Sequence, residues 1–206
     1  MTGAYIRWRS SRLGAITDRL EQSLLLELFE PVAGKTLLDV GCGDGALAAV
    51  LARRGARATG LDADPAMVAA ARQRAKREAV PLTVVEGKGD ALPFHPDTFD
   101  VTLAVTSLCF IRDAEQAIGE MTRVLKPGGR MVIGELRRWS LWSLQRRVRG
   151  WLGNPTWRVA AFRTTTKLRS LVEAAGLEVI AIRGAAYYPP FALAADLLAP
   201  LDSWLG

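Results

Sequence analysis

The feature that most constrains the fold of this chain is the stretch Leu37-Leu38-Asp39-Val40-Gly41-Cys42-Gly43-Asp44-Gly45. Its short apolar run is typical of a buried strand. The glycines at 41, 43 and 45 let the backbone turn sharply and approach a ligand where a side chain would collide. A strand that leads through such a turn into a helix predicts an α/β fold with a binding site at the turn.

Two kinds of ligand fit the spacing of these glycines. Gly41-x-Gly43-x-x-Ala46 matches the dinucleotide-binding fingerprint, and Asp62 lies about twenty residues downstream, as that fingerprint requires. A pyrophosphate is anionic, however, and the carboxylates of Asp39 and Asp44 would repel it. S-adenosylmethionine carries a sulfonium and an ammonium group instead, and acids favour both. The charges thus favour S-adenosylmethionine, with a dinucleotide or an ordinary glycine-rich turn as the alternatives.

The rest of the chain alternates between strand-like and helix-like segments. The predicted strands are residues 36–40, 57–62, 82–86, 99–105, 130–136 and 177–183. The predicted helices are residues 16–30, 45–54, 64–78, 113–125, 166–175 and 191–205. Uninterrupted alternation up to residue 136 favours a parallel sheet with helices on both faces. We therefore expect a single α/β domain over residues 1–206.

Composition narrows the class of protein. With 206 residues, half of them hydrophobic, the chain can bury one substantial core. Two distant cysteines and one histidine exclude a disulfide framework and a cysteine- or histidine-rich metal site, so no metal is predicted. The first residues lack the apolar core of a signal peptide, and no run approaches the ~18 to 20 apolar residues of a membrane span. These features predict a cytoplasmic protein.

Positive charge is concentrated in one segment. Residues 137–172 contain nine Lys or Arg and no acid, so the rest of this +6 chain carries −3. Four of the six tryptophans lie in the same segment. We expect residues 137–165 to form a basic, Trp-rich insertion and residues 184–206 a C-terminal tail with a helix.

Four landmarks occur in order: LLDVGCGDG at 37–45, GLDADPAM at 60–67, GDALPFHPDTFDV at 89–101 and RVLKPGGRMVI at 123–133. On these motifs the chain resembles the class I S-adenosylmethionine-dependent methyltransferases, particularly the small-molecule enzymes similar to those of ubiquinone and menaquinone biosynthesis. The resemblance covers roughly residues 1–183. It implies a Rossmann-like, seven-stranded, mostly parallel sheet, with S-adenosylmethionine as cofactor and S-adenosylhomocysteine as product.

The resemblance also implies roles for individual residues. Asp39 and the glycine backbone would hold the methionine part of the cofactor, and Asp62 would accept the ribose hydroxyls. Relatives often place an adenine-binding Asp where this chain has Lys88, so either Asp90 or the backbone near Gly89 takes that role, and we favour Asp90. The complete set of predicted cofactor residues is Asp39, Gly41, Cys42, Gly43, Asp62, Ala63, Met67, Asp90, Ala91 and Thr106. Met67 and Asp62 also have plain structural interpretations, as helix core and turn acid.

No catalytic residue is assigned from the sequence. Methyl transfer depends mainly on positioning and a dry pocket, and it needs a general base only when the nucleophile arrives protonated. The candidates near the active end of the sheet are Thr106, Ser107, Cys109 and Glu135, for each of which we favour a structural role. His95 lies between prolines and is expected to be a solvated loop residue.

The acceptor is predicted to be a small or lipid-like molecule. Ala104-Val105-Thr106-Ser107-Leu108 lacks the Asn/Asp-Pro-Pro-aromatic motif of base-amino methyltransferases, which argues against DNA, and two cysteines are too few for arsenic methylation. An RNA or protein methyltransferase, or a module that binds S-adenosylmethionine without transferring methyl, remains the alternative. No oligomeric state is predicted.

Residues 137–151 predict a basic amphipathic helix with Leu141, Leu144, Val148 and Trp151 on one face. We consider four roles for it: a lid over the substrate pocket, which we favour; peripheral contact with a membrane; contact with RNA; or simple packing in the core.

Overall fold

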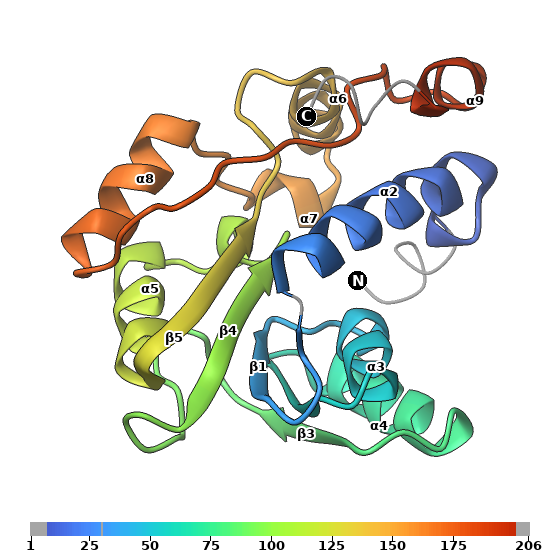
Figure 1. Cartoon of the computed structure of the whole chain (residues 1–206). Coiled ribbons are helices and arrows are strands. Elements are labelled where there is room, and N and C mark those ends of the chain that lie inside the picture. Colours follow the sequence, from blue (N-terminus) through green and yellow to red (C-terminus); the bar gives the residue numbers. More distant parts are fainter. Residues whose placement is uncertain (1–7, 30, 201–206) are drawn as a thin grey trace. The chain divides into compact units, whose positions relative to one another are not determined.

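The computed structural model describes residues 8–29 and 31–200, which form two compact units (Figure 1). The sheet unit consists of Phe29–Glu135 and Thr166–Glu178. The helical unit consists of Met1–Leu28, Leu136–Thr165 and Val179–Gly206. The predicted insertion and tail both belong to the helical unit. The single domain over residues 1–206 stays a prediction.

The sheet unit contains five parallel strands in the order β3-β2-β1-β4-β5. Their bounds are β1 Thr36–Val40, β2 Arg57–Asp62, β3 Leu82–Glu86, β4 Phe99–Val105 and β5 Leu125–Gly134. In the central register, Asp39 of β1 lies between Gly60 of β2 and Leu103 of β4. Because all five strands run in the same direction, their carboxyl ends share one edge of the sheet.

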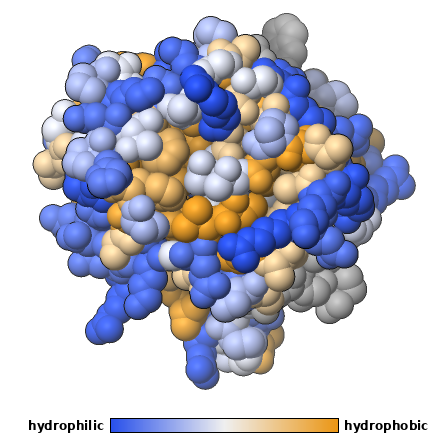
Figure 2. Space-filling view, turned by 90° about the horizontal axis from the view of Figure 1, so that it is seen from below, coloured by the Kyte–Doolittle hydropathy of each residue, from blue (hydrophilic) through white to orange (hydrophobic). Residues whose placement is uncertain are grey.

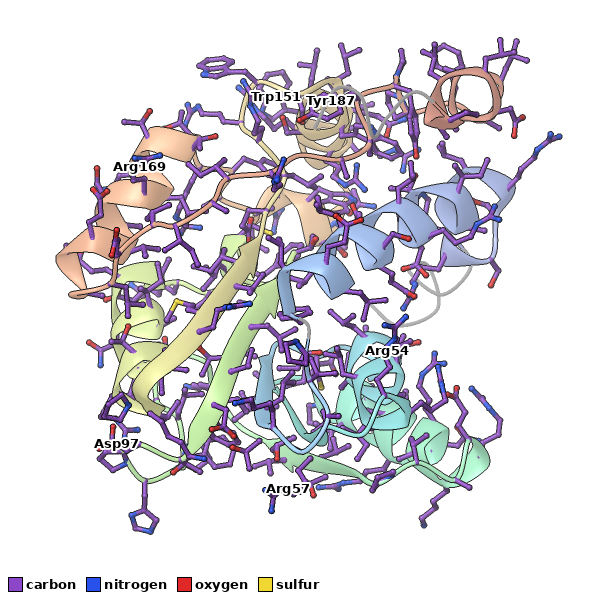
Figure 3. The ribbon with its side chains drawn as sticks, viewed as in Figure 1. Arg54, Arg57, Asp97, Trp151, Arg169 and Tyr187 are labelled. Carbon is purple, nitrogen blue, oxygen red and sulfur yellow. The ribbon has the colours of Figure 1, made fainter. Side chains whose placement is uncertain are left out.

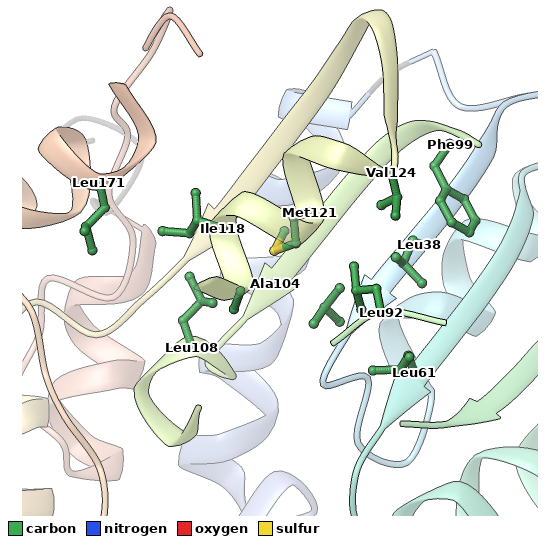
Figure 4. Close-up of a cluster of buried hydrophobic side chains, with 12 residues drawn as sticks. Leu38, Leu61, Leu92, Phe99, Ala104, Leu108, Ile118, Met121, Val124 and Leu171 are labelled. Carbon is green, nitrogen blue, oxygen red and sulfur yellow. The ribbon is translucent and has the colours of Figure 1, made fainter. Parts of the chain in front are cut away.

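Helices cover both faces of this sheet (Figure 1). They are α3 Ala46–Arg53 and α4 Pro65–Arg77 on one face, and α5 Ala114–Arg123 and α8 Thr165–Ala174 on the other. Leu38 and Val40 of β1 pack with Ile118 and Met121 of α5 in the largest apolar cluster (Figure 4). Side chains alternate along a strand, so Asp39 lies on the opposite face from Leu38 and Val40.

Side-chain caps define where two of these helices begin. Asp64 accepts a hydrogen bond from the amide of Ala66 and is followed by Pro65, so α4 starts as the sequence predicts. Asp113 caps α5 in the same way through the amide of Gln116. Both capping residues follow strands that end at the shared edge. They therefore mark where the loops at that edge end and the helices begin.

The prediction of seven strands is wrong for the described residues, which contain five. Residues 177–183, predicted as a strand, are irregular, and Ile180 and Ile182 are exposed. An alternating apolar pattern favours an extended backbone, but a strand also needs a hydrogen-bonded neighbour, and the pattern cannot supply one. The predicted strand 130–136 is also displaced, since β5 runs from Leu125 to Gly134 and includes the Pro-Gly turn.

The helical unit contains α2 Arg12–Phe29, α6 Leu141–Trp151, α7 Pro155–Arg158 and α9 Ala192–Leu198. Its core joins Trp142 of α6 to Tyr188 and to Ala194 and Ala195 of α9. The indole of Trp142 donates a hydrogen bond to the carbonyl of Tyr188 at 2.9 Å. The predicted helix 191–205 is observed as α9, and residues 201–206 lie outside the described residues. Among the described helices, none combines the length and apolar character needed to cross a membrane.

Candidate functional site

The candidate site lies at the carboxyl edge of the sheet unit. The glycine loop follows β1, Asp62 ends β2, the loop 87–91 follows β3, and Thr106 follows β4. In open α/β sheets, ligands bind at this edge where the strand order reverses, which here is between β1 and β4. The topology thus brings together the segments that the sequence predicted to bind a cofactor.

The glycine loop has a backbone that side chains disfavour. Gly41, Gly43 and Gly45 have φ angles of 75°, 57° and 73°. A Cβ at Gly41 would lie 2.4 Å from the Cβ of Ser107, whereas a Cβ at Gly43 would meet nothing within 4 Å. Gly41 is therefore required by packing inside the protein, and Gly43 borders open space that a ligand can enter.

Asp62 holds this loop in place. One carboxylate oxygen accepts the amide of Gly43 at 2.8 Å, and the other accepts the amide of Asp64 at 2.9 Å. Each oxygen keeps a second lone pair, so the carboxylate can still accept hydroxyl groups. Asp62 is thus both a turn acid and a candidate ribose ligand, which combines the two interpretations made from the sequence.

Asp39 is buried at the same edge, and within the part of the chain that the structure describes its carboxylate receives no hydrogen bond. Burial, and then the negative charge of Asp62, raise the pKa of Asp39 to about 7. A buried carboxylate without a partner is costly. An ammonium group beside it would supply the missing hydrogen bonds and the opposite charge. The residues present therefore fit the amino-acid end of S-adenosylmethionine.

Asp44 does not contribute free charge to the site. Its carboxylate forms a hydrogen-bonded ion pair with Arg74 of α4, and Arg74 also donates to the backbone carbonyl of Asp44 at 2.9 Å. Burial lowers the pKa of Arg74, but the hydrogen bonds and the negative charges of Asp44 and Glu78 outweigh it and raise this pKa. The preference for a cationic ligand consequently rests on Asp39 and Asp62, and Asp44 fixes the loop to α4.

The loop after β3 is packed tightly against the site. A Cβ at Gly89 would lie 2.6 Å from Ile111 and 2.9 Å from Val40, so only glycine fits there. Lys88 is exposed and Asp90 is half-buried. Both observations agree with Asp90 as the adenine ligand, which stays a prediction, as does the neighbouring Ala91.

Three further predicted cofactor residues have different surroundings in the structure. Ala63 is exposed at the end of β2, whereas Met67 is buried in α4, where it packs as helix core. Thr106 has a φ of 51°, an unusual backbone for a β-branched residue, and its amide donates to the carbonyl of Gly134 at 2.7 Å. Such strain concentrates at functional sites, and no local sequence pattern indicates it.

The catalytic candidates have structural partners. Ser107 donates a hydrogen bond to the carbonyl of Val40 at 2.7 Å. Glu135 accepts the amide of Cys109 at 3.1 Å. Burial and the charges of Asp39 and Asp62 raise the pKa of Cys42, which keeps it a thiol. These residues shape the edge, and no catalytic base is assigned.

His95 belongs to the other end of the sheet. Its carbonyl accepts a hydrogen bond from Thr98, just before β4, and the residue is exposed. This position agrees with a solvated loop residue.

A hollow at the amino ends of the strands is separate from the site. It is lined by Thr36, Arg57, Ala58, Thr59, Pro81, Thr83, Phe94, Thr98 and Phe99. Arg57 and Asp97 mark this end of the sheet in Figure 3. On the face seen from below, apolar residues gather near the middle and hydrophilic residues surround them (Figure 2). Because ligands of open sheets bind at the opposite edge, this hollow is not the candidate cofactor site.

Comparisons with known proteins agree with this geometry. Residues 38–133 match the family model described as "Methyltransferase domain". The chain is 32% identical over 166 residues to a ubiquinone biosynthesis O-methyltransferase of Methylobacterium sp. (strain 4-46), an alignment that covers 78% of this chain and 66% of that protein. It is 37% identical over 135 residues to a demethylmenaquinone methyltransferase of Thermus thermophilus, covering 65% and 56%.

Among solved structures, an S-adenosylmethionine-dependent methyltransferase of Thermotoga maritima, called a "possible histamine N-methyltransferase", aligns with a TM-score of 0.72 and 26% identity. The alignment covers 85% of this chain and 77% of that one. The chain belongs to the class I S-adenosylmethionine-dependent methyltransferases. It spans about two thirds or less of the length of the two curated relatives.

Proposed function

We propose that this chain is an S-adenosylmethionine-dependent methyltransferase that acts on a small or lipid-like molecule in the cytoplasm. The observation that carries the proposal is the pairing of Asp39, a buried carboxylate without a hydrogen-bond partner in the described structure, with the open space at Gly43. Together they form a cradle for a cationic ligand that approaches the backbone closely.

Each predicted residue has a separate part in holding the cofactor. Asp39 and the amides of the glycine loop bind the amino-acid end, Asp62 accepts the ribose hydroxyls, and Asp90 accepts the adenine amino group. When bound, the sulfonium supplies a methyl group for in-line displacement by the acceptor. The protein's contribution is to position the acceptor and to exclude water, because charge disperses in this displacement. An acceptor that arrives protonated must also lose its proton to a base, and no residue is assigned to that step.

The acceptor class is supported by the relatives. Two of them are named a ubiquinone biosynthesis O-methyltransferase and a demethylmenaquinone methyltransferase, and their alignments cover 78% and 65% of this chain. We extend to this chain the class of acceptor, a small or lipid-like molecule, and we add peripheral contact with a membrane as the means by which a lipid-like acceptor reaches it.

Transfer of a radiolabelled methyl group to fractionated cell extract tests the proposal. We expect label in the small-molecule or organic-soluble fraction. Label confined to RNA or protein would establish the alternative of a macromolecular methyltransferase. Absence of label from every fraction, despite tight binding of S-adenosylmethionine, would instead establish a binding module without transfer activity.

A further inference from the structure

Helix α6 exposes four of its apolar residues to solvent and buries Ser143 and Arg146 beside Trp142. The exposed fractions of Leu141, Leu144, Val148 and Trp151 are 54%, 48%, 39% and 75%. An amphipathic helix that packs in a core buries this kind of face. The buried residues of α6 are instead Trp142, Ser143, Arg146 and Gly150. Simple core packing, one of the four roles considered for this helix, therefore does not explain its apolar face.

Contacts inside the helical unit fix this orientation. The guanidinium of Arg146 lies 4.8 Å from the ring centre of Trp157, 5.1 Å from that of Trp142 and 5.7 Å from that of Trp8. Hydrogen bonds also hold Ser143, whose hydroxyl donates to the carbonyl of Arg138 at 2.7 Å. Turning the leucines inward would remove Trp142 from the core and Arg146 from its aromatic surroundings. The exposure of the apolar face is thus a consequence of how the helix packs.

The exposed apolar surface extends beyond α6. We define it by the large exposed apolar side chains of residues 139–152 and of α9: Trp139, Leu141, Leu144, Val148, Trp151, Leu152, Leu193, Leu197 and Leu198. The last three lie on α9, whose Ala194 and Ala195 pack in the same cluster as Trp142 of α6. Trp151 lies along the upper side of the view in Figure 3. Four of these side chains share one face of α6, and an exposed apolar face with a polar border indicates a binding surface.

Arginines border this surface. The guanidinium of Arg147 lies 5.6 Å from the ring centre of Trp151, and that of Arg138 lies 5.4 Å from Trp139. Both indoles are largely exposed, so these pairs stand at the surface. Residues 137–165, which all belong to the helical unit, contain seven arginines and no acidic residue. Leucine and tryptophan surrounded by arginine is the composition of a helix that lies in a membrane interface.

We propose that the exposed apolar surface docks on a bilayer that contains anionic phospholipid. The leucines and tryptophans enter the interface between headgroups and acyl chains, and the arginines bind the lipid phosphates. A second copy of the chain fits less well, because it would bring two strongly basic surfaces together. RNA fits less well too, since the leucines offer nothing to a nucleic acid. Such docking would bring the protein to a lipid-like acceptor, and this use of the surface rests on the proposed function.

Vesicle sedimentation of the full chain tests this proposal. Vesicles of phosphatidylcholine alone are compared with vesicles that also contain phosphatidylglycerol. We expect binding to the anionic vesicles, at least tenfold weaker binding to the neutral ones, and weakening by salt. Absence of binding to either vesicle would overturn the proposal, as would self-association or RNA binding that depends on the same residues while vesicles are not bound.

Variants separate the surface from general effects. We expect Leu144→Ser with Trp151→Ser to reduce vesicle binding at least tenfold, and Arg147→Ser with Arg149→Ser to reduce it several-fold. The matched controls are Ile180→Ser, which removes an exposed apolar side chain elsewhere, and Lys76→Ser, which removes an exposed charge on α4. Equal losses in the controls would overturn the proposal.

Binding of S-adenosylmethionine, measured on the same samples, distinguishes the two proposals. Loss of vesicle binding with cofactor binding intact shows that the surface acts separately from the cofactor site. If the unaltered chain binds the cofactor but no vesicles, this surface assignment and the proposed membrane contact fail, and the proposed methyl transfer to a small molecule stands. If it binds vesicles but no cofactor, the proposed function fails and the surface assignment stands.

Discussion

As the proposed ligand of an ammonium group, Asp39 would couple the stability of the fold to ligand binding. Its burial opposes ionisation, so the free carboxyl keeps its proton up to about pH 7. A cationic ligand beside it would reverse this balance, because it favours the ionised form. The side chain that destabilises the empty site at neutral pH would therefore strengthen the proposed complex. Strain of this kind is common where a protein is organised for its ligand.

The first prediction concerns stability against pH. The pKa of Asp39 rises from 3.8 to about 7 on folding, so the folded state binds more protons between these values and the free energy of unfolding falls as pH rises through them. Asp39→Asn should remove about 2 to 4 kcal/mol of this fall, measured by urea unfolding at pH 5 and pH 8. Glu21→Gln is a necessary comparison, because burial also raises the pKa of Glu21 to about 7. A fall unchanged in Asp39→Asn would contradict the assignment.

The second prediction concerns protons released on binding. S-adenosylmethionine should bind more tightly as pH rises from 6 to 8, by at most about tenfold per unit, because its ammonium requires ionised Asp39. Calorimetry in buffers of different ionisation enthalpy should show release of up to about one proton near pH 7. Asp39→Asn should release fewer protons and Glu21→Gln should behave like the unaltered chain. Equal release by all three would refute the role of Asp39.

The sequence was sufficient to predict the residues of the candidate site, but not the contacts that these residues make. Asp39, Gly43 and Asp62 stand out because each lies next to a strand end that local pattern predicts. The pairing of Asp44 with Arg74 was missed, because it joins residues thirty positions apart through the packing of α4. The close approach of Ser107 to Gly41 was missed for the same reason, since no local signal reports which loops meet at the edge of a sheet.

At the scale of structural elements, two glycines of the loop after β1 have different roles: Gly41 is needed for packing, and Gly43 is proposed to border the ligand. Gly41→Ala should destabilise the fold by about 3 kcal/mol or more, because its Cβ would both disfavour the backbone angle and collide with Ser107. Gly43→Ala should cost only about 1 kcal/mol, because its Cβ enters open space. That Cβ should nevertheless weaken S-adenosylmethionine binding at least tenfold. Urea unfolding and calorimetry check both, and unchanged cofactor binding by Gly43→Ala would show that the ligand lies elsewhere.

Helix α6 gives a second prediction about elements. Trp142→Ala should lower the free energy of unfolding by about 3 to 5 kcal/mol, because Trp142 is buried against Tyr188. Leu144→Ala should change it by less than about 0.5 kcal/mol, because Leu144 is exposed. Similar losses in the two variants would contradict the observed orientation of the helix.

Periodicity predicted the existence of α6 but not which face packs. Its apolar stripe placed Leu144 and Val148 on one face but left open whether that face packs in the core, and aromatic contacts around Arg146 bury the other side. The strand predicted at 177–183 failed for a related reason, because pattern alone does not provide a pairing partner. By contrast, the strands β1 to β4 were predicted with the observed bounds, since each is a short segment between clear turn or helix signals. The lid role of residues 137–151 stays a prediction.

The whole molecule divides its chemistry between its two units. The sheet unit carries the methyltransferase family match and the candidate cofactor site. The helical unit carries the aromatic and basic segment that we propose as a membrane-docking surface. The proposed sites for the methyl donor and for the bilayer thus belong to different units.

Calorimetric titration with S-adenosylmethionine tests most directly whether this edge of the sheet holds the methyl donor. The unaltered chain should bind it, and should not bind NADH. Asp62→Asn should bind at least tenfold more weakly, because both oxygens of Asp62 accept backbone amides and an amide nitrogen would oppose one of them. Asp97→Asn makes the same chemical change just before β4, at the amino ends of the strands, and this variant should bind S-adenosylmethionine normally. Binding of NADH without S-adenosylmethionine, or equal affinity in Asp62→Asn and Asp97→Asn, would contradict this assignment of the site.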